Sequence, residues 1–374
     1  MNPPPTPTPT DDQVAAVALA GLPAMTPARL RHLLAGCGSP TAAADAVTRG
    51  RAAPVLAPHT AVRHRDRLAA DAATWPDRLD LSATGATMRR RGARAWLTDD
   101  RHYPVLDPLP HRPSVLVAEG SRPDALDQPR VAIVGTRAAT PHGLADAHEL
   151  AGTLAAAGVT IVSGLALGID GAAHAGAVAA GGCTVGVVAT GLDVEYPRRH
   201  RRLYHDVRAH GLVLGETGYG VRPDPTRFPI RNRIIAALAD VVVVVEATLT
   251  GGARITADHA LTYQRPVFAV PGSRRNPAAA GTNALIADGA HPCTDWTDLL
   301  LALGLTPAAR RAPATRLAPD GDDTTVLHAL GGEPATPEQI AARTHLDPAR
   351  VAAALATLQR TGWVSLDRGV VWPA

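Results

Sequence analysis

Glycine, threonine and arginine stand together directly after a short apolar run, VAIV, in the segment GTRAATPHG at 135–143. Gly135 permits a tight turn, Thr136 offers a hydroxyl and a backbone N–H, and Arg137 is placed to project over the edge of a sheet. Backbone N–H groups at a helix start attract anions, and a guanidinium forks onto phosphate oxygens. The pattern predicts an anion site, with an ordinary strand-to-helix turn as the alternative.

A second glycine-rich turn, SGLALGIDGAAH at 163–174, also follows an apolar run. Its glycines are spaced G-x-x-x-G-x-x-G, which is not the G-x-G-x-x-G pattern of dinucleotide-binding turns. Because glycines lack side chains, they let a phosphate backbone approach the peptide groups, so Ser163 and Gly164 are candidate contacts. Asp170 is placed to cap the next helix, and we expect a structural rather than a catalytic role for His174.

Two arginines flank Asn232 in the segment FPIRNRIIAALADVVVVVEA, which begins at Phe228. Arg231 and Arg233 stand at an expected helix start, where they are poorly placed for burial and well placed for phosphates. Phe228 is able to stack on a base, as aromatic side chains do in proteins that bind single strands. A solvated helix end is the alternative interpretation.

The charge distribution connects these motifs with a further turn, TLTGGARITADHA, in which Gly251 and Gly252 open a helix. All 37 basic residues of the chain are arginine, and the net charge is only +3. Between Arg198 and Arg275, however, 13 arginines stand against six acidic residues. A basic stripe along glycine-lined turns indicates a polyanion rather than a mononucleotide as ligand. A solvated surface is the alternative.

Several classes of enzyme lack their required residues in this sequence. A Walker A motif is missing, and a chain without lysine cannot supply a P-loop lysine, so we do not expect an ATPase. The G-x-S-x-G turn and the H-x-x-x-H spacing are missing as well, and Cys37, Cys183 and Cys293 lie far apart. We therefore predict a protein that is not an enzyme and that holds neither a metal nor a cofactor.

The N-terminus lacks the basic and apolar regions of a signal peptide. The most apolar run, 241–245, is too short to span a membrane. Together with the absence of a disulfide pattern, these features predict a cytoplasmic protein without a membrane partner.

Short apolar runs such as VAIVG, TIVSG, TVGVVATG and VVVVVEA alternate with helix-like stretches from about residue 128 onward. Buried runs that alternate with helices predict an α/β fold, an extended Rossmann-like, doubly wound parallel sheet. Ligands bind at the carboxyl ends of the strands in such sheets, and each motif above stands at such an end. Over the whole chain, the sequence predicts a disordered tail at 1–10, a helical domain at 11–75, a connector at 76–127, the α/β domain at 128–305, a linker at 306–321 and a winged helix at 322–374.

Six motifs in this order, VAIVGTR, IVSGLALGIDGAAH, GLDVEYP, FPIRNRIIAALA, ITADHAL and VFAVPG, resemble the DprA/Smf family of DNA-processing proteins over residues 103–300. The helical N-terminus is similar to that family's sterile-alpha-motif-like domain. The resemblance implies a Rossmann-like protein that forms a homodimer and binds single-stranded DNA. It also implies that the protein protects incoming DNA and loads the RecA recombinase during natural transformation. The implied DNA contacts are Gly135, Thr136, Arg137, Ser163, Gly164, Phe228, Arg231, Asn232, Arg233 and Gly252.

Two departures from the family pattern bear on the site, and two other functions are alternatives. Thr250-Gly251-Gly252 stands where an S-G pair is common, and arginine must replace lysine around the pocket. The architecture also resembles nucleoside-monophosphate phosphoribohydrolases, whose P-G-G-x-G-T-x-x-E stretch carries a catalytic glutamate. Here His259 stands three residues after Thr256, so this nucleotide-processing enzyme is the alternative hypothesis. A transcription regulator that binds duplex DNA through the winged helix is the third.

Overall fold

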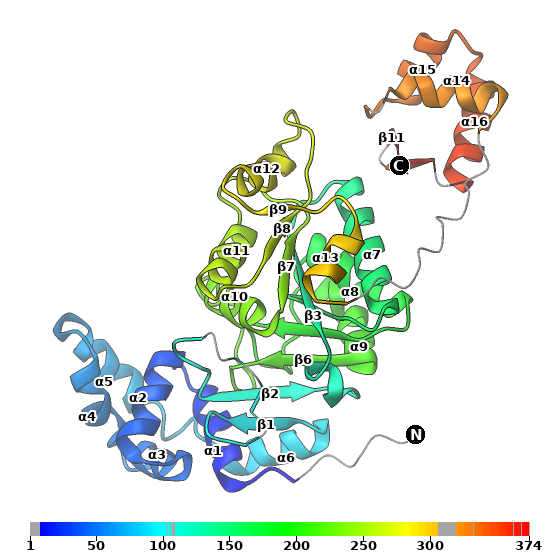
Figure 1. Ribbon diagram of the computed structural model, residues 1–374. Helices are drawn as coiled ribbons and strands as arrows, with labels where there is room; N and C mark the ends of the chain where they lie inside the picture. Colours follow the sequence, from blue (N-terminus) through cyan, green and yellow to red (C-terminus); the bar gives the residue numbers. More distant parts are fainter. Residues whose placement is uncertain are drawn as a thin grey trace.

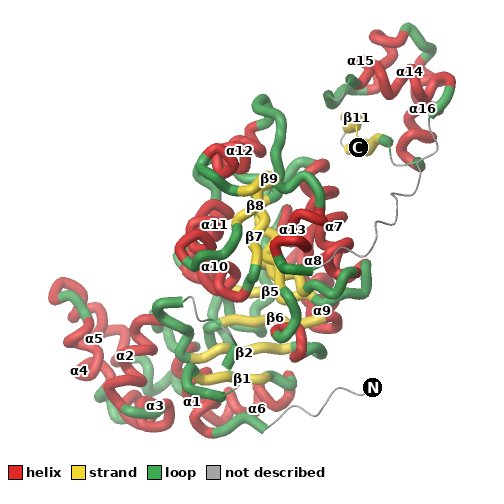
Figure 2. The backbone as a smooth tube through the Cα atoms, viewed as in Figure 1, coloured by secondary structure: helices red, strands yellow, loops and turns green. Residues whose placement is uncertain are grey.

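The computed structural model describes residues 8–373 except 102, 105, 107, 108, 306–318, 332, 362 and 368. Most of the expected tail at 1–10 and of the expected linker at 306–321 therefore lies outside the described residues. The described chain forms a nine-stranded sheet flanked by helices, preceded by a group of helices and followed by a small helical unit with a hairpin (Figure 1; Figure 2). Within the described ranges, every helix is too short or too polar to traverse a lipid bilayer.

The sheet has the strand order β1-β2-β6-β5-β4-β3-β7-β8-β9, and the strands from β6 to β9 pair in parallel. The chain runs outward from β3 to β6 on one side and from β7 to β9 on the other. In open α/β sheets such a reversal opens a crevice at the carboxyl ends of the strands. The predicted Rossmann-like sheet is confirmed. The strands are β1 (Arg94–Leu97), β2 (Val115–Glu119), β3 (Arg130–Val134), β4 (Thr160–Ser163), β5 (Thr184–Val188), β6 (Gly211–Gly215), β7 (Val241–Val244), β8 (Val267–Ala269) and β9 (His291–Pro292).

Alternating strand side chains divide the core between the two faces of the sheet. Val131 and Ile133 of β3 pack on one face and Ala132 and Val134 on the other, because successive side chains of a strand point in opposite directions. Helices α7, α8 and α13 cover the first face, and α10, α11 and α12 cover the second. These helices, with α9 and three short 3-10 turns, are η3 (Pro123–Leu126), α7 (Pro141–Ala156), α8 (Ile169–Ala179), η4 (Arg198–His200), α9 (Arg201–His210), α10 (Arg227–Leu238), α11 (Gly252–Thr262), η5 (Pro277–Ala279), α12 (Ala280–Ala287) and α13 (Trp296–Ala302).

The N-terminal helices pack directly against the edge of the sheet. The Thr26 side chain accepts a hydrogen bond from the backbone N–H of Arg29, and Pro27 takes the first helical position, as predicted. Trp75 is fully buried in a cluster that includes Val117 of β2, so these helices share a core with the strands. The elements are α1 (Asp11–Ala20), α2 (Pro27–Cys37), α3 (Pro40–Thr48), α4 (Ala52–Leu56), η1 (Ala57–His59), η2 (Val62–His64), α5 (Arg65–Ala73) and α6 (Leu81–Arg91).

The segment 76–127, expected to be a connector, instead contributes α6 and two strands to the fold. β2 is buried at all five positions and pairs antiparallel with both β1 and β6, with Val117 opposite Gly215. The sequence hides these strands because both are short and a proline-rich stretch separates them. The sheet is therefore extended by two antiparallel strands beyond the α/β domain predicted at 128–305.

The C-terminal unit has the order helix, helix, helix, hairpin, which confirms the predicted winged helix. Thr336 forms a capping box and Pro337 takes the first position of its second helix. Arg350, on the expected recognition helix, donates to Asp322 through two hydrogen bonds of 2.7 and 2.6 Å. The pair is exposed, with exposed side-chain fractions of 60% and 33%, so it does not decide whether Arg350 contacts DNA, and the transcription regulator stays a hypothesis. The elements are α14 (Gly321–Leu330), α15 (Pro337–Thr344), α16 (Pro348–Arg360), β10 (Val364–Asp367) and β11 (Val370–Pro373).

Candidate nucleic-acid interface

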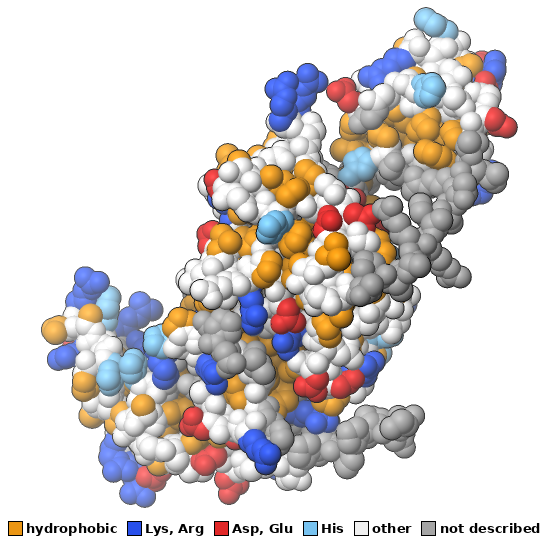
Figure 3. Space-filling view, in the orientation of Figure 1, with side chains coloured by type: hydrophobic (Ala, Val, Ile, Leu, Met, Phe, Trp, Pro, Cys, Tyr) orange, Lys and Arg blue, Asp and Glu red, His pale blue; other side chains and the backbone are white. Residues whose placement is uncertain are grey.

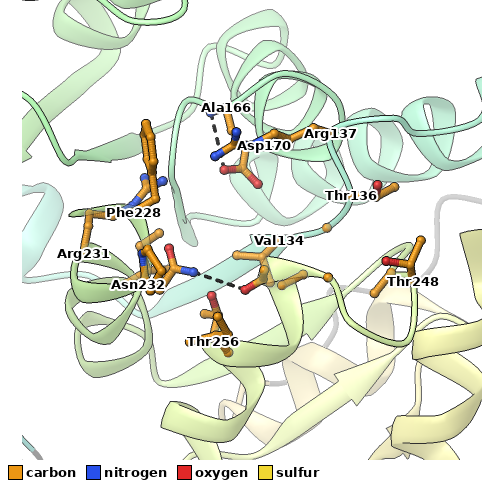
Figure 4. A pocket seen from close by; sticks show the side chains of 18 of the residues that line it. Val134, Thr136, Arg137, Ala166, Asp170, Phe228, Arg231, Asn232, Thr248 and Thr256 are labelled. Carbon is orange, nitrogen blue, oxygen red and sulfur yellow. Dashed lines mark hydrogen bonds between the residues drawn. The ribbon is translucent and has the colours of Figure 1, made fainter. Parts of the chain in front are cut away.

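A cavity of about 480 Å³ opens where the strand order reverses, at the carboxyl ends of β3, β4 and β7 (Figure 4). Its walls come from the turns after β3 and β7, the start of α8 and one face of α10. Seven predicted contact residues line it: Gly135, Thr136, Arg137, Phe228, Arg231, Asn232 and Gly252. Residues that we did not predict as contacts line it as well, among them Ala166, Asp170, Tyr196, Ile235, Thr248 and Thr256.

Helix α10 presents one continuous face to the cavity. Phe228, Arg231, Asn232 and Ile235 are spaced i, i+3, i+4 and i+7, so a single side of the helix carries all four. The Asn232 side-chain amide donates to the backbone carbonyl of Gly252 across the cavity at 3.2 Å. This bond links α10 to the start of α11, so Asn232 has a structural role at the site.

Arg233 lies outside the cavity wall, so its predicted place beside Arg231 is wrong. Two residues further along α10, it projects about 200° around the helix axis from Arg231. Its guanidinium forms an ion pair with the Glu216 carboxylate and donates to the His111 carbonyl at 3.4 Å. Burial raises the pKa of Glu216, and the Arg233 charge acts against that shift. Arg233 is thus engaged by an internal carboxylate.

Arg231 lines the floor of the cavity but is only 5% exposed, so the expectation that it is poorly placed for burial is wrong. Its Nη1 donates to the carbonyls of Gly164, at 2.7 Å, and Val187. The Asp170 carboxylate lies nearby and accepts from the backbone N–H groups of Gly164 at 3.1 Å and Ala166 at 3.4 Å. Arg231 therefore connects α10 with the ends of β4 and β5.

The charges of Arg231 and Asp170 offset each other at this floor. Burial raises the pKa of Asp170 and lowers that of Arg231, and in each case the charge of the other residue opposes the shift. Gly164 makes the arrangement possible, because a Cβ there would overlap the guanidinium and come within 2.6 Å of Asp170 Oδ2. The Ser163 hydroxyl is buried and donates to the Ile133 carbonyl at 2.6 Å. Ser163 and Gly164 thus build the floor and do not line the cavity.

Arg137 and Phe228 lie against each other on the open side of the cavity. Arg137 is exposed, and its Cζ lies 4.9 Å from the centroid of the Phe228 ring, within the range of a cation–π contact. In Figure 4 the Arg137 side chain reaches from the turn after β3 toward Phe228 on α10. Tyr196 is 41% exposed, and its ring centroid lies 5.8 Å from that of Phe228. In the sequence, the only indication that Tyr196 belongs to the site is its place in the GLDVEYP motif.

The helix starts at the cavity differ in whether they can accept an anion. Glu246 accepts from the Thr140 backbone N–H at 2.9 Å and from its hydroxyl at 2.6 Å, so a negative charge of the protein already occupies the start of α7. An anion bound at the turn 135–143 therefore cannot take the amides at the start of α7, where the anion site was predicted. Helix α11 starts after Gly251 with no side-chain cap, and Gly252 is exposed with open space around its α-carbon. The first amides of α11 thus suit an anion.

The alternative of a nucleotide-processing enzyme gains no support at this site. In the stretch after Gly252, Thr256 lines the cavity, whereas Asp258 is exposed and is not a wall residue. His259 stacks on the Tyr263 ring, with centroids 5.8 Å apart. Among the described residues, no three His, Cys, Asp or Glu side chains gather where they could hold a metal ion.

His174 is fully buried beneath the site. Its Nδ1 lies 2.7 Å from the Thr184 hydroxyl, which donates to the Ile161 carbonyl, so Nδ1 carries the proton. Burial, together with the charges of His200 and Arg231, lowers the pKa of His174 to about 3. The residue is a neutral hydrogen-bond donor within the core, as its expected structural role requires.

Comparison with known proteins agrees with this architecture. Residues 94–304 match the family of DNA recombination-mediator protein A, and residues 299–365 match the DprA winged helix domain. A putative DNA processing protein DprA of Mycobacterium tuberculosis is 40% identical over 347 residues, which cover 88% of this chain and 86% of the relative. Fold, cavity and winged helix together define a Rossmann-like DNA-processing protein. The chain belongs to the DprA/Smf family.

Two solved structures extend the comparison to three dimensions. The X-ray structure of DNA processing protein A from Streptococcus pneumoniae has a TM-score of 0.62 and 31% identity, and covers 78% of this chain and 98% of its own. DNA processing protein A from Helicobacter pylori, which has a single-stranded DNA binding mode, has a TM-score of 0.51 and 31% identity. That match covers 56% of this chain and 95% of the other.

Replacing Arg231 by methionine should lower the free energy of unfolding by about 3–5 kcal/mol, because Asp170 would remain buried without a compensating charge. Urea unfolding followed by circular dichroism measures this change. Arg137→Met is the matched control and should stay within about 0.5 kcal/mol of the wild type, since Arg137 is exposed. The double variant Arg231→Met/Asp170→Asn should recover part of the loss. If Arg231→Met were as stable as the wild type, Arg231 would not compensate the buried charge of Asp170.

His174 should make folding sensitive to acid. Its pKa of about 3 in the folded protein lies below the ordinary value of 6.5, so the unfolded chain takes up the proton first as the pH falls. The contribution of neutral His174 to the free energy of unfolding is complete above pH 6.5 and is lost as the pH falls toward 3. The loss amounts to about 2 kcal/mol by pH 5. Urea unfolding at pH 7 and pH 5 should show a smaller difference for His174→Asn than for the wild type. An equal difference would refute this role.

Proposed function

We propose that the protein binds single-stranded DNA in the cavity between β3 and β7. The observation that carries this proposal is the exposed Arg137 over the Phe228 ring, beside the uncapped start of α11. A guanidinium binds a phosphate and a ring stacks on a base, which is the combination that sites for single strands use. Tyr196 supplies a second ring next to Phe228. Bases in a duplex are stacked on one another, so a single strand suits these rings better.

An exposed basic cluster supports a polymeric ligand. It follows Tyr196 along the chain and consists of the arginines of η4 (Arg198–His200) together with Arg201 and Arg202. The last two side chains are 81% and 96% exposed, and their acidic neighbours lie 3.6 and 4.0 Å away. Exposed pairs of this kind contribute little, so the arginines are available to phosphates. A strand that continues past Tyr196 would meet this cluster, whereas a mononucleotide would not.

The proposed biological role is that of a recombination mediator. We infer that the protein protects incoming DNA, loads the RecA recombinase onto it during natural transformation, and acts as a cytoplasmic homodimer. Family membership supports this role, and the single-stranded DNA binding mode of the Helicobacter pylori relative supports the ligand. Covering the phosphates and bases of a strand shields it from nucleases, so the proposal needs neither a catalytic step nor a cofactor.

Removing both accessible groups in Arg137→Ala/Phe228→Ala should weaken single-strand binding about 100-fold, because a stacked base and a phosphate contact are lost together. Fluorescence anisotropy at two salt concentrations should also show a salt slope lower by roughly 0.7, the value for one phosphate. Arg63→Ala, an exposed arginine beside α5, controls for net charge and should bind like the wild type. The proposed site fails if the double variant keeps wild-type affinity, and a preference for duplex would contradict the ligand.

The RecA part of the proposal has its own test. Wild-type protein should shorten the lag before RecA filaments form on single strands, measured by light scattering. Arg137→Ala/Phe228→Ala should leave that lag as long as it is without added protein, because a mediator must first hold the strand. A lag that wild-type protein does not change would overturn the loading role while leaving strand binding intact.

A further inference from the structure

The loop at 271–276, PGSRRN, follows the carboxyl end of β8 and carries two arginines at its tip. Arg274 and Arg275 are both exposed, and the Arg275 side chain is 75% accessible. Figure 3 shows basic side chains gathered at the tip of this loop, which projects from the body of the α/β domain. The sequence has no acidic residue between Asp258 and Asp288, so the loop contains no carboxylate to offset its charge. We call residues 271–276 the arginine loop.

Hydrogen bonds hold the base and the turn of the arginine loop in place. The Asn283 side chain accepts from the backbone N–H of Gly272 at 3.1 Å and donates to the carbonyl of Gly272 at 2.9 Å. Within the loop, the Ser273 carbonyl accepts from Asn276 N–H at 2.9 Å, and the Ser273 hydroxyl accepts from Arg275 N–H at 3.3 Å. A loop tied at both points presents its arginines with less entropy to lose on binding.

The arginine loop and the cavity share one edge of the sheet. β8 pairs in parallel with β7, so the carboxyl ends of the two strands lie side by side. At the start of α12, the Gly281 N–H donates to the Ala247 carbonyl at 2.7 Å, and a Cβ on Gly281 would come within 2.5 Å of the Thr248 carbonyl. Ala247 and Thr248 both line the cavity. The helix that holds the base of the loop therefore packs directly on the cavity wall.

Glu333 is an acidic neighbour of the loop but a weak competitor for its arginines. Arg275 Nη1 lies 3.5 Å from a Glu333 carboxylate oxygen, and the two side chains are 75% and 68% exposed. Exposed pairs at this distance contribute little to stability. A phosphate carries more negative oxygens and accepts both arms of a guanidinium, so it can displace this carboxylate.

We propose that Arg274 and Arg275 form a second phosphate-contact site, which holds the same single strand after it leaves the cavity past Thr248. This inference rests on the proposed function, because it takes the cavity as the place where the strand is bound. Neither arginine lines the cavity, whereas a longer polyanion that continues along the same edge of the sheet would meet both. The loop therefore sets how much of the strand the protein covers.

The test compares two strand lengths on the full chain. Oligothymidylates of about 4 and about 16 nucleotides span the range of known single-strand site sizes. Arg274→Ala/Arg275→Ala should bind the long strand about tenfold more weakly, with a salt slope lower by roughly 1.4 for two phosphates, and should bind the short strand like the wild type. Arg63→Ala/Arg67→Ala removes the same charge from the N-terminal helical domain and should stay within about twofold of the wild type for both strands.

The outcomes separate this inference from the proposed function. Wild-type affinity of Arg274→Ala/Arg275→Ala for the long strand overturns the loop site, including the case in which the loop serves an acidic protein surface instead. Equal weakening for both strand lengths also overturns it, because the loop would then belong to the cavity footprint. If Arg137→Ala/Phe228→Ala binds both strands normally, the proposed function itself fails. Both arginines of the loop are exposed, so unchanged urea unfolding should accompany the binding defect.

Discussion

A buried guanidinium is the contact on which the geometry of the site depends. Arg231 donates to the carbonyl that follows β4 and to one within β5, and so connects α10 to the ends of two strands. Asp170 at the start of α8 offsets its charge, and the missing side chain of Gly164 leaves room for both groups. Once Arg231 is in place, helical spacing puts Phe228 on the same side of α10, at the cavity. The position of the half-buried Phe228 ring thus follows from contacts inside the protein.

This contact divides the cavity into a floor of balanced charge and a positive rim. The floor holds Arg231 opposite Asp170, whereas the rim holds Arg137 over a ring and the uncapped start of α11. Glu246 closes the start of α7, whereas α11 starts at the cavity with no side-chain cap. Under the proposed function, affinity would come from phosphates and ring stacking at the rim. Such contacts tolerate many base sequences and weaken with salt.

Much of the fold could be predicted from the sequence because its signals are local. Apolar runs marked the parallel strands, and the caps at Thr26 and Thr336 marked two helix starts where the structure has them. The winged helix followed from the order of such elements. β1 and β2 could not be predicted, because they are short, prolines separate them, and their place depends on pairing with β6 far along the chain. The same holds for Glu246, whose partner at Thr140 belongs to another turn.

The arginines show why the candidate site could be predicted only in part. A spacing of two residues leaves Arg231 and Arg233 side by side at a solvated helix end, but α10 begins at Arg227, so the helix turns them to different sides. There Arg233 pairs with Glu216 and the charge of Asp170 acts on Arg231, and both carboxylates stand elsewhere in the sequence. Arginine suits such burial because it stays charged and its guanidinium can donate to two carbonyls at once. In a chain whose only strong cation is arginine, the number of arginines in a motif therefore overstates the charge available to a ligand. What distinguishes Arg137 is that it lies over a ring rather than beside a carboxylate.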